Sequence, residues 1–137
     1  MFFEDIIFDS NIKSNTSNMS SPNLFNEKEG FMYGNMFKNE YLPYKNYRVS
    51  KLDATSDKGE LILKIYEYDF ALNDLSLYLD LHPECETVYK LFRRYTEEQR
   101  KYVDMYEKKY GPLELTDSDY SSYMWENGPW PFEGGRI

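Results

Sequence analysis

The stretch from Leu61 to Leu81 constrains the fold most, because its apolar residues recur with a helical period. One set steps by three and four residues, which places its members on one helix face. This set is Leu61, Ile65, Tyr68, Leu72, Leu75 and Leu79. A second set, at roughly 100° per residue about 180° from the first, is Leu63, Tyr66, Phe70, Leu77 and Leu81. The pattern predicts a helix with two opposite apolar faces.

Both apolar faces are expected to be covered in the folded protein. Burying a set of this size contributes on the order of 10 kcal/mol, which is comparable with the whole stability of a small domain. One helical partner covers one side only, so the other side meets the rest of this chain, a second copy or a different protein. The flanks between the faces are polar and expected to be solvated: Asp69, Asn73, Ser76 and Asp80, and opposite them Glu60, Lys64, Glu67 and Asp74.

A second helix follows after a short turn. Pro83 cannot continue the first helix and is expected at the first position of the next, where its missing N–H costs nothing. The first helix is predicted over about residues 58–81, with Ser56 or Asp57 as its N-cap, and the second over about residues 83–110. The apolar stripe of the second helix is Val88, Phe92, Tyr95, Tyr102 and Tyr106. The short connection makes the pair an antiparallel hairpin, and the predicted fold class is all-α.

The chain before the hairpin divides into two predicted segments. Residues 1–29 are rich in Asn and Ser and bury too little apolar surface to offset the entropy of ordering, so we expect a flexible arm. Residues 30–57 form an irregular segment in which Gly and Pro interrupt aromatics. That segment lies along an apolar side of the central helix or docks on another protein. Its contact-making residues are Phe31, Met32, Phe37, Tyr41, Leu42 and Tyr44.

Residues 58–137 comprise the hairpin and a tail that carries both tryptophans of the protein among prolines and glycines. Prolines beside aromatics give a stiff, extended segment that loses little entropy on docking. The tail folds back on the hairpin or anchors in a groove on a partner. The residues expected to contact a partner are Trp125, Pro129, Trp130 and Phe132, followed by Phe37, Tyr41 and Tyr44.

Composition narrows the functional classes. The formal net charge of −8, without a basic stripe, argues against nucleic-acid binding. No apolar run approaches the roughly 18–20 residues of a membrane span, and the first residues lack the features of a signal peptide. One cysteine cannot form an internal disulfide, so we expect synthesis in a reducing compartment. Aromatic residues make up 18% of the sequence. Either they serve as contact side chains in interfaces with other chains, or this small domain uses Tyr in its core where others use Leu.

The sequence contains no catalytic or metal-binding constellation. One histidine, His82, makes no conventional His-based site and is expected to be a turn or N-cap residue. Cys85 is expected in the first turn of the second helix, and is either a reactive thiol or a small half-buried residue. Asp69, Asp74 and Asp80 are expected to be solvated rather than ligands. We therefore expect a protein that is not an enzyme and holds neither cofactor nor metal.

Three motifs follow one another along the chain: LNDLSLYLDLHPE at Leu72–Glu84, YEKKYGPL at Tyr106–Leu113 and YMWENGPWPFE at Tyr123–Glu133. In this order they resemble motifs of the CotJB spore-coat proteins. The resemblance covers about residues 62–133. Upstream, residues 30–44 are similar in spacing to a segment of CotJA-type coat proteins, which implies that this chain joins two coat polypeptides. Five residues fall nearly on that pattern, with Glu40 offset by one residue and Lys38 in place of a proline: Gly30, Gly34, Phe37, Glu40 and Pro43.

The resemblance implies a non-enzymatic, structural component of the endospore coat that acts through protein–protein contacts. It implies synthesis during sporulation in the mother-cell cytoplasm, followed by assembly into the spore coat. The implied partners are other coat proteins, including the manganese-catalase-like CotJC protein, with self-association as a further option. The alternative is a soluble adaptor or regulatory subunit of a catalase-like enzyme, which acts by helix-in-groove contact.

Overall fold

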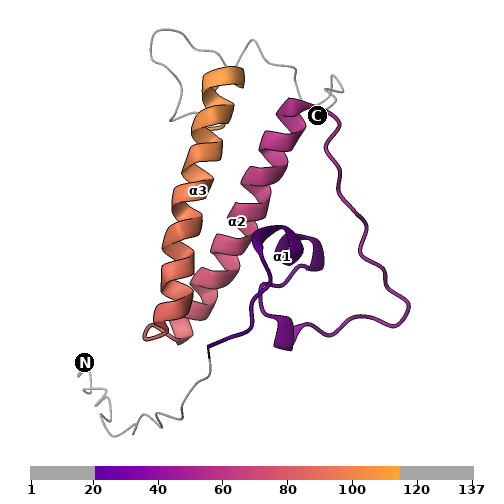
Figure 1. The fold of residues 1–137 in the computed structure, drawn as a ribbon, viewed down its shortest axis with the longest axis vertical. Coiled ribbons are helices and arrows are strands. Elements are labelled where there is room, and N and C mark those ends of the chain that lie inside the picture. The colour runs from indigo at the N-terminus through magenta and orange to yellow at the C-terminus, as the bar shows by residue number, and fades with distance from the viewer. Residues whose placement is uncertain (1–20, 115–137) are drawn as a thin grey trace, which may run out of the picture.

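The computed structural model describes residues 21–114, and all its regular elements are helices. In chain order they are α1 (Glu27–Tyr33), the 3-10 helix η1 (Lys38–Glu40), α2 (Asp57–Leu81) and α3 (Glu86–Tyr110). Helices α2 and α3 lie side by side as an antiparallel hairpin, which confirms the predicted fold class (Figure 1). Among residues 21–114, no helix combines the length and the apolar character needed to cross a membrane.

The ends of the hairpin helices follow from local hydrogen bonding. Helix α2 begins after Ser56, whose Oγ accepts a hydrogen bond from the Gly59 N–H at 3.0 Å, as an N-cap does. Helix α3 begins later than the predicted start at Pro83. The chain reverses direction over this stretch, and the Cys85 N–H donates to the His82 carbonyl at 3.0 Å within the turn. The proline therefore belongs to the turn between the helices rather than to the first turn of α3.

The open end of the hairpin is closed by the first residue of α2. The Asp57 carboxylate accepts hydrogen bonds from the Lys109 ammonium and, at 2.6 Å, from the Tyr110 hydroxyl. These hydrogen bonds lower the pKa of Asp57. All three side chains are exposed, so we expect this contact to align the two helices more than to add stability.

Helix α1 lies where the sequence predicts the end of a flexible arm and the start of an irregular segment. Asn26 Oδ1 accepts a hydrogen bond from the Glu29 N–H at 2.8 Å, and the Glu29 carboxylate accepts one from the Asn26 N–H at 3.4 Å. This reciprocal pair is a capping box. At the other end Gly34 has a φ of 71°, the left-handed conformation that terminates helices. Capping residues, rather than hydrophobic period, encode this helix.

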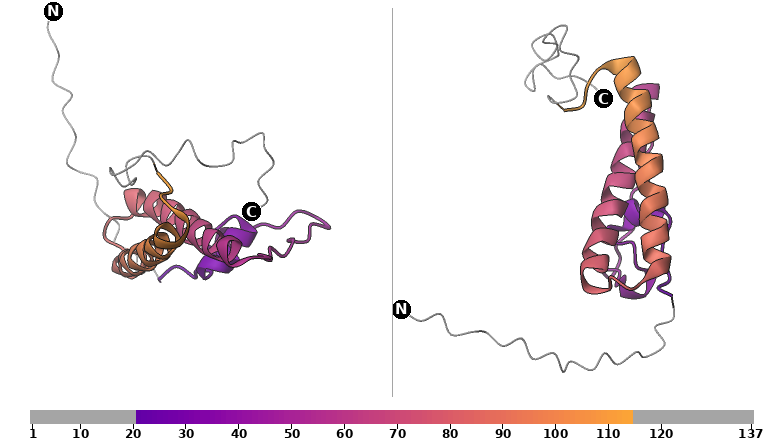
Figure 2. Two further views of the ribbon diagram at one scale, coloured as in Figure 1. Left: turned by 90° about the horizontal axis from the view of Figure 1, so that it is seen from above. Right: turned by 90° about the vertical axis from the view of Figure 1, so that its left-hand side faces the viewer.

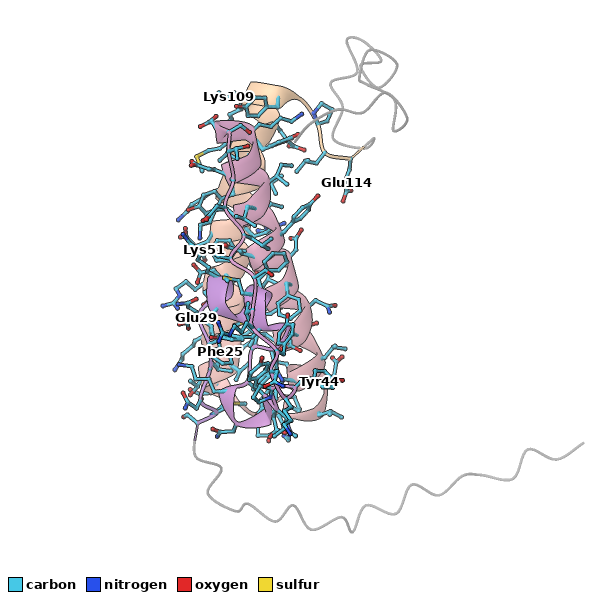
Figure 3. All side chains as sticks on the ribbon, turned by 90° about the vertical axis from the view of Figure 1, so that its right-hand side faces the viewer. Phe25, Glu29, Tyr44, Lys51, Lys109 and Glu114 are labelled. Atoms are coloured by element: carbon cyan, nitrogen blue, oxygen red, sulfur yellow. The ribbon has the colours of Figure 1, made fainter. Side chains whose placement is uncertain are left out.

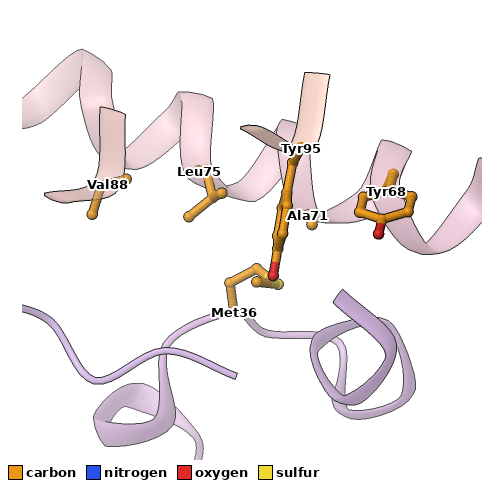
Figure 4. Packing of buried hydrophobic residues seen from close by; sticks show 6 residues of the cluster. All are labelled: Met36, Tyr68, Ala71, Leu75, Val88 and Tyr95. Atoms are coloured by element: carbon orange, nitrogen blue, oxygen red, sulfur yellow. The ribbon is translucent and has the colours of Figure 1, made fainter. Parts of the chain in front are cut away.

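The core lies where α2, α3 and the segment preceding α2 meet. Its buried residues are Met36, Tyr68, Ala71, Leu75, Val88 and Tyr95. Figure 4 shows Met36 on the N-terminal segment, pointing toward the helices, with the hydroxyl end of Tyr95 beside it. Tyr68 and Tyr95 meet edge to face with ring centroids 5.3 Å apart, an arrangement that aromatic quadrupoles favour.

The N-terminal segment covers a flank of α2 that the sequence predicts to be solvated. The Met36 N–H donates to the Asp74 carboxylate at 2.7 Å. Glu67 on the same flank is 2% exposed and accepts a hydrogen bond from Lys64 at 2.5 Å. The expectation of solvation is wrong for Glu67 and Asp74. Glu67 is buried and paired with Lys64 of the same helix, and Asp74 is partly buried and accepts a backbone hydrogen bond from the N-terminal segment.

The second apolar face of α2 is covered only in part. Phe70 is half-buried against Phe31 of α1, with ring centroids 6.1 Å apart. Tyr66, Leu77 and Leu81 remain 50%, 57% and 79% exposed. Helix α2 therefore lies between two layers, but the second layer sits on a polar flank and reaches only the edge of this apolar face.

Gly30 of α1 is buried against Met36, and a Cβ added at residue 30 would overlap the Met36 sulfur. Met36 is 0% exposed, so its side chain can give way only by displacing its neighbours in the core. We expect Gly30→Ala to lower the free energy of unfolding by about 1–3 kcal/mol, the usual cost of overpacking. Urea denaturation followed by circular dichroism measures this loss.

The same substitution in a Met36→Ala background is the control. Once the sulfur is gone, Gly30→Ala adds a better helix former without a clash and is expected to be neutral or to stabilise by about 0.5–1 kcal/mol. An equal loss in both backgrounds would contradict the packing of α1 on Met36.

Candidate contact surface

The predicted contact residues that the structure describes differ in how much surface they present. Phe37 stacks on Tyr78 of α2 with ring centroids 4.7 Å apart. Tyr41 packs against Tyr33 with centroids 5.0 Å apart, and both Phe37 and Tyr41 are half-buried. Tyr44 is 85% exposed. Outside the described residues lie Trp125, Pro129, Trp130 and Phe132.

The connection between η1 and α2 carries a run of exposed apolar side chains. They are Leu42 at 87%, Tyr44 at 85%, Tyr47 at 55% and Leu52 at 47% exposed, and we call these four residues the linker surface. Figure 1 and the left view of Figure 2 show that this connection stands away from the helices. Figure 3 views the molecule from its side and labels Tyr44 and Lys51 on it. Tyr47 and Leu52 were not predicted as contact residues, although the absence of a helical period around them was a usable signal.

The charges beside the linker surface are basic. Lys45, Arg48 and Lys51 are exposed and lie between or beside its apolar members, and the first acidic residue that follows is Asp53. Lys51 pairs with Asp53 at 3.1 Å. In a chain with a formal net charge of −8, this stretch is therefore a local basic and aromatic strip.

A groove of about 480 Å³ lies between α2 and α3, near the end where α2 begins and α3 finishes. We call it the hairpin groove. Its apolar lining is Ile62, Ile65, Tyr66, Val103 and Leu113, and its polar rim is Asp69, Gln99, Arg100, Asp104 and Glu114. A smaller hollow of about 230 Å³ shares Ile62 and Tyr66 and is bounded on its far side by Leu52 and Leu63. The ridge formed by Ile62 and Tyr66 therefore has a hollow on each side.

A partly buried ionic cluster connects the three α-helices. Lys64 Nζ lies 2.5 Å from Glu67 and 3.8 Å from Glu27 of α1. The Tyr95 hydroxyl of α3 donates to Glu27 Oε2 at 3.3 Å. No buried side-chain nitrogen or oxygen within residues 21–114 lacks a hydrogen-bond partner. The buried charge of Glu67 is therefore paired, as a charge in a protein interior must be.

The cluster shifts the pKa values of two of its members. Burial lowers the pKa of Lys64, but the hydrogen bond and charge of Glu67, helped by the charge of Glu27, outweigh burial and raise it. Burial raises the pKa of Tyr95, and the charge of Glu27 raises it further. Both groups hold their protons more tightly in the folded protein than in water.

The histidine, cysteine and aspartates that were weighed as reactive or metal-binding residues cap helices, accept hydrogen bonds or face solvent. His82 is the C-cap of α2, and half-buried Cys85 is the N-cap of α3. Asp69 accepts a hydrogen bond from α3 and Asp74 one from the N-terminal segment, whereas Asp80 is exposed. In the part of the chain that the structure describes, no three His, Cys, Asp or Glu side chains gather as a metal site would require.

Comparison with known proteins identifies the hairpin. A protein-family model described as CotJB protein matches residues 59–133, which is more than half of the chain. The chain belongs to the CotJB family. This confirms the CotJB resemblance and relates the chain to the spore coat. No curated protein and no solved structure matches it.

The CotJB match starts just inside α2, runs through α3 and continues beyond the described residues. Residues 30–44 lie outside it, so their similarity to CotJA-type proteins stays a prediction. The linker surface also lies outside the match, whereas every residue that lines the hairpin groove lies inside it.

The ionic cluster predicts how stability depends on pH. A folded pKa above the unfolded value means that the stabilisation is present below the unfolded pKa and is lost as pH rises through the folded one. For Tyr95 and Lys64 the unfolded values are about 10 and 10.4, so the urea midpoint is expected to fall from about pH 10 upward. Circular dichroism at a series of pH values between neutral and strongly alkaline measures it.

Glu27→Gln tests the source of this pH dependence. Without the Glu27 charge, the pKa values of Lys64 and Tyr95 are raised less. The urea midpoint should therefore fall less steeply at alkaline pH than in the natural chain. Glu60→Gln, at an exposed position of α2, is the matched control and should leave the fall unchanged. A midpoint indifferent to pH in this range, or to Glu27→Gln, would rule out the cluster as a stabilising contact.

Proposed function

We propose that this CotJB-family chain is a structural component of the bacterial endospore coat and works through protein–protein contacts. The observation that carries the proposal is the linker surface, where Leu42 and Tyr44 leave more than four fifths of their side chains in water. Covering large apolar side chains releases roughly 1.5–3 kcal/mol each when burial is complete. A partner that covers this surface therefore gains substantial binding free energy.

The chemistry of the linker surface defines the kind of partner. Tyrosine is enriched in interface cores, where its ring is buried and its hydroxyl is hydrogen-bonded. The exposed Lys45, Arg48 and Lys51 favour a partner face that carries acidic residues around an apolar pocket. The proposed partners are other coat proteins with such a face, among them the manganese-catalase-like CotJC protein that the family resemblance implies. A second copy of this acidic chain is a further candidate.

The upstream CotJA-like segment, residues 30–44, belongs to the same proposal. Its first part is fastened to the hairpin through Met36 and Phe37, and its last residues, Leu42 and Tyr44, begin the linker surface. This arrangement supports a role in which the segment anchors the exposed linker on the CotJB-family hairpin and holds it clear of the helices.

Substitution of Leu42, Tyr44 and Tyr47 by Ser in the full chain tests the proposal. In sporulating cells, the fraction of a fluorescent fusion that associates with the coat is expected to fall several-fold, because the apolar contact is lost. Helix content by circular dichroism should not change, since each side chain is at least half exposed.

The matched control substitutes Gln for Leu77, Leu81 and Tyr89, which are exposed apolar residues of the helices. This variant should reach the coat normally. Normal coat association of the Ser variant would contradict the linker surface as the contact site. Recovery of the natural chain only as a soluble complex with one enzyme, at a fixed ratio, would contradict a coat component.

A further inference from the structure

The hairpin groove is an apolar hollow that lies beside the point where the tail of the same chain begins. We propose that the hairpin groove is the docking site of residues 115–137 of its own chain, filled by Trp125 or Trp130. This proposal concerns the free chain and does not rest on coat assembly. It selects, between the two alternatives left open by the sequence, the tail that folds back on the hairpin.

The chain leaves the described region at the groove. After α3 ends, the Leu113 N–H donates to Glu107 Oε1 at 3.2 Å, which turns the backbone back along α3. Leu113 and Glu114 then form part of the groove lining. A segment tethered beside its site has an effective concentration on the order of millimolar, so weak contacts suffice to hold it.

The length of chain beyond Glu114 is sufficient to reach the whole groove. An extended chain spans at most about 3.3–3.6 Å per residue, so the stretch between Glu114 and Trp125 reaches on the order of 35 Å. Prolines flank Trp130, and a segment stiffened by proline loses little entropy on docking.

The groove has the size and lining that an indole ring needs. Its volume of about 480 Å³ lies within the roughly 300–1,000 Å³ of sites that enclose small organic groups. Ile62, Tyr66 and Val103 supply apolar walls. An indole N–H requires an acceptor when buried, and the rim carries the carboxylates of Asp69 and Asp104.

The family match joins the groove to its proposed occupant. The matched region continues past α3 to residue 133 and so includes the aromatic part of the tail. Both parts therefore lie in the one sequence unit that defines the family, whereas the linker surface lies outside it. If the tail docks on the hairpin of its own chain, its presence in the same family unit as the groove is explained.

The neighbouring hollow beyond the ridge of Ile62 and Tyr66 offers a second apolar site within reach of the same segment.

Tryptophan fluorescence tests the proposal in the full chain, because the two tryptophans of the protein both lie in the tail. In the native protein at monomeric concentration, emission is expected at shorter wavelength than in urea, with several-fold weaker quenching by acrylamide. Val103→Asp places a charge in the groove and should shift emission to longer wavelength and restore quenching. Met105→Asp, at an exposed position of α3 outside the groove, is the control and should change neither.

Three fluorescence results would overturn the proposal. They are emission of the native chain that already equals that of the unfolded chain, buried tryptophans that ignore Val103→Asp, and burial that disappears on dilution. The last result would assign the groove to a second copy. None of these outcomes depends on coat recruitment, so failure here is distinct from failure of the proposed function.

A photo-cross-linking amino acid in place of Tyr66 gives a second measurement that adds no charge to the groove. Tyr66 lines the groove and is half exposed, so the hairpin should keep its fold. Intrachain cross-links to residues 123–132 are expected. Cross-links only to residues 21–58, or only between chains, would contradict the proposal even if Val103→Asp unfolds the protein.

Discussion

The burial of Met36 is the contact on which the rest of the structure depends. Its side chain is 0% exposed within a core built by α2 and α3, and its N–H donates to Asp74 at 2.7 Å. This pair of contacts fixes the N-terminal segment on the hairpin and brings Glu27 of α1 to Lys64 and Tyr95. A helical hairpin alone offers each helix only one neighbour, so the added layer encloses a core that two helices do not enclose.

The position of that layer determines which apolar surfaces of the hairpin and linker stay exposed. Because the N-terminal segment sits on a polar flank of α2, Tyr66, Leu77 and Leu81 keep at least half of their surface in water. The return from η1 to α2 runs clear of the helices and exposes Leu42 and Tyr44 (Figure 1). The packing that stabilises the fold thus leaves two apolar regions open: one on the linker outside the CotJB match, and one on the hairpin inside it.

The sequence predicts the hairpin well because each of its helices, at 25 residues, is long enough for a hydrophobic period to be recognised. Helix α1 has 7 residues, which is too short for a period, and its capping box at Asn26 and Glu29 is the only strong signal. The partial burial of Asp74 depends on its contact with Met36, which lies 38 residues earlier in the chain, and no local pattern encodes that contact. For the described contact residues, the sequence predicts that the aromatics make contacts but not whether each is buried in this chain or exposed. Tyr44 faces water, whereas Phe37 packs on α2.

The central claim is that the N-terminal segment is part of the hairpin core through Met36. The most direct measurement is a nuclear Overhauser spectrum of the full chain with methyl-labelled methionine, with the Met36 signal assigned by its loss in Met36→Leu. Cross-peaks from the Met36 methyl group to the Tyr95 ring and to other members of the buried cluster are predicted, because these residues share one packed core. A Met36 methyl signal with the shift of a solvent-exposed methionine and no cross-peak to α2 or α3 would contradict the account.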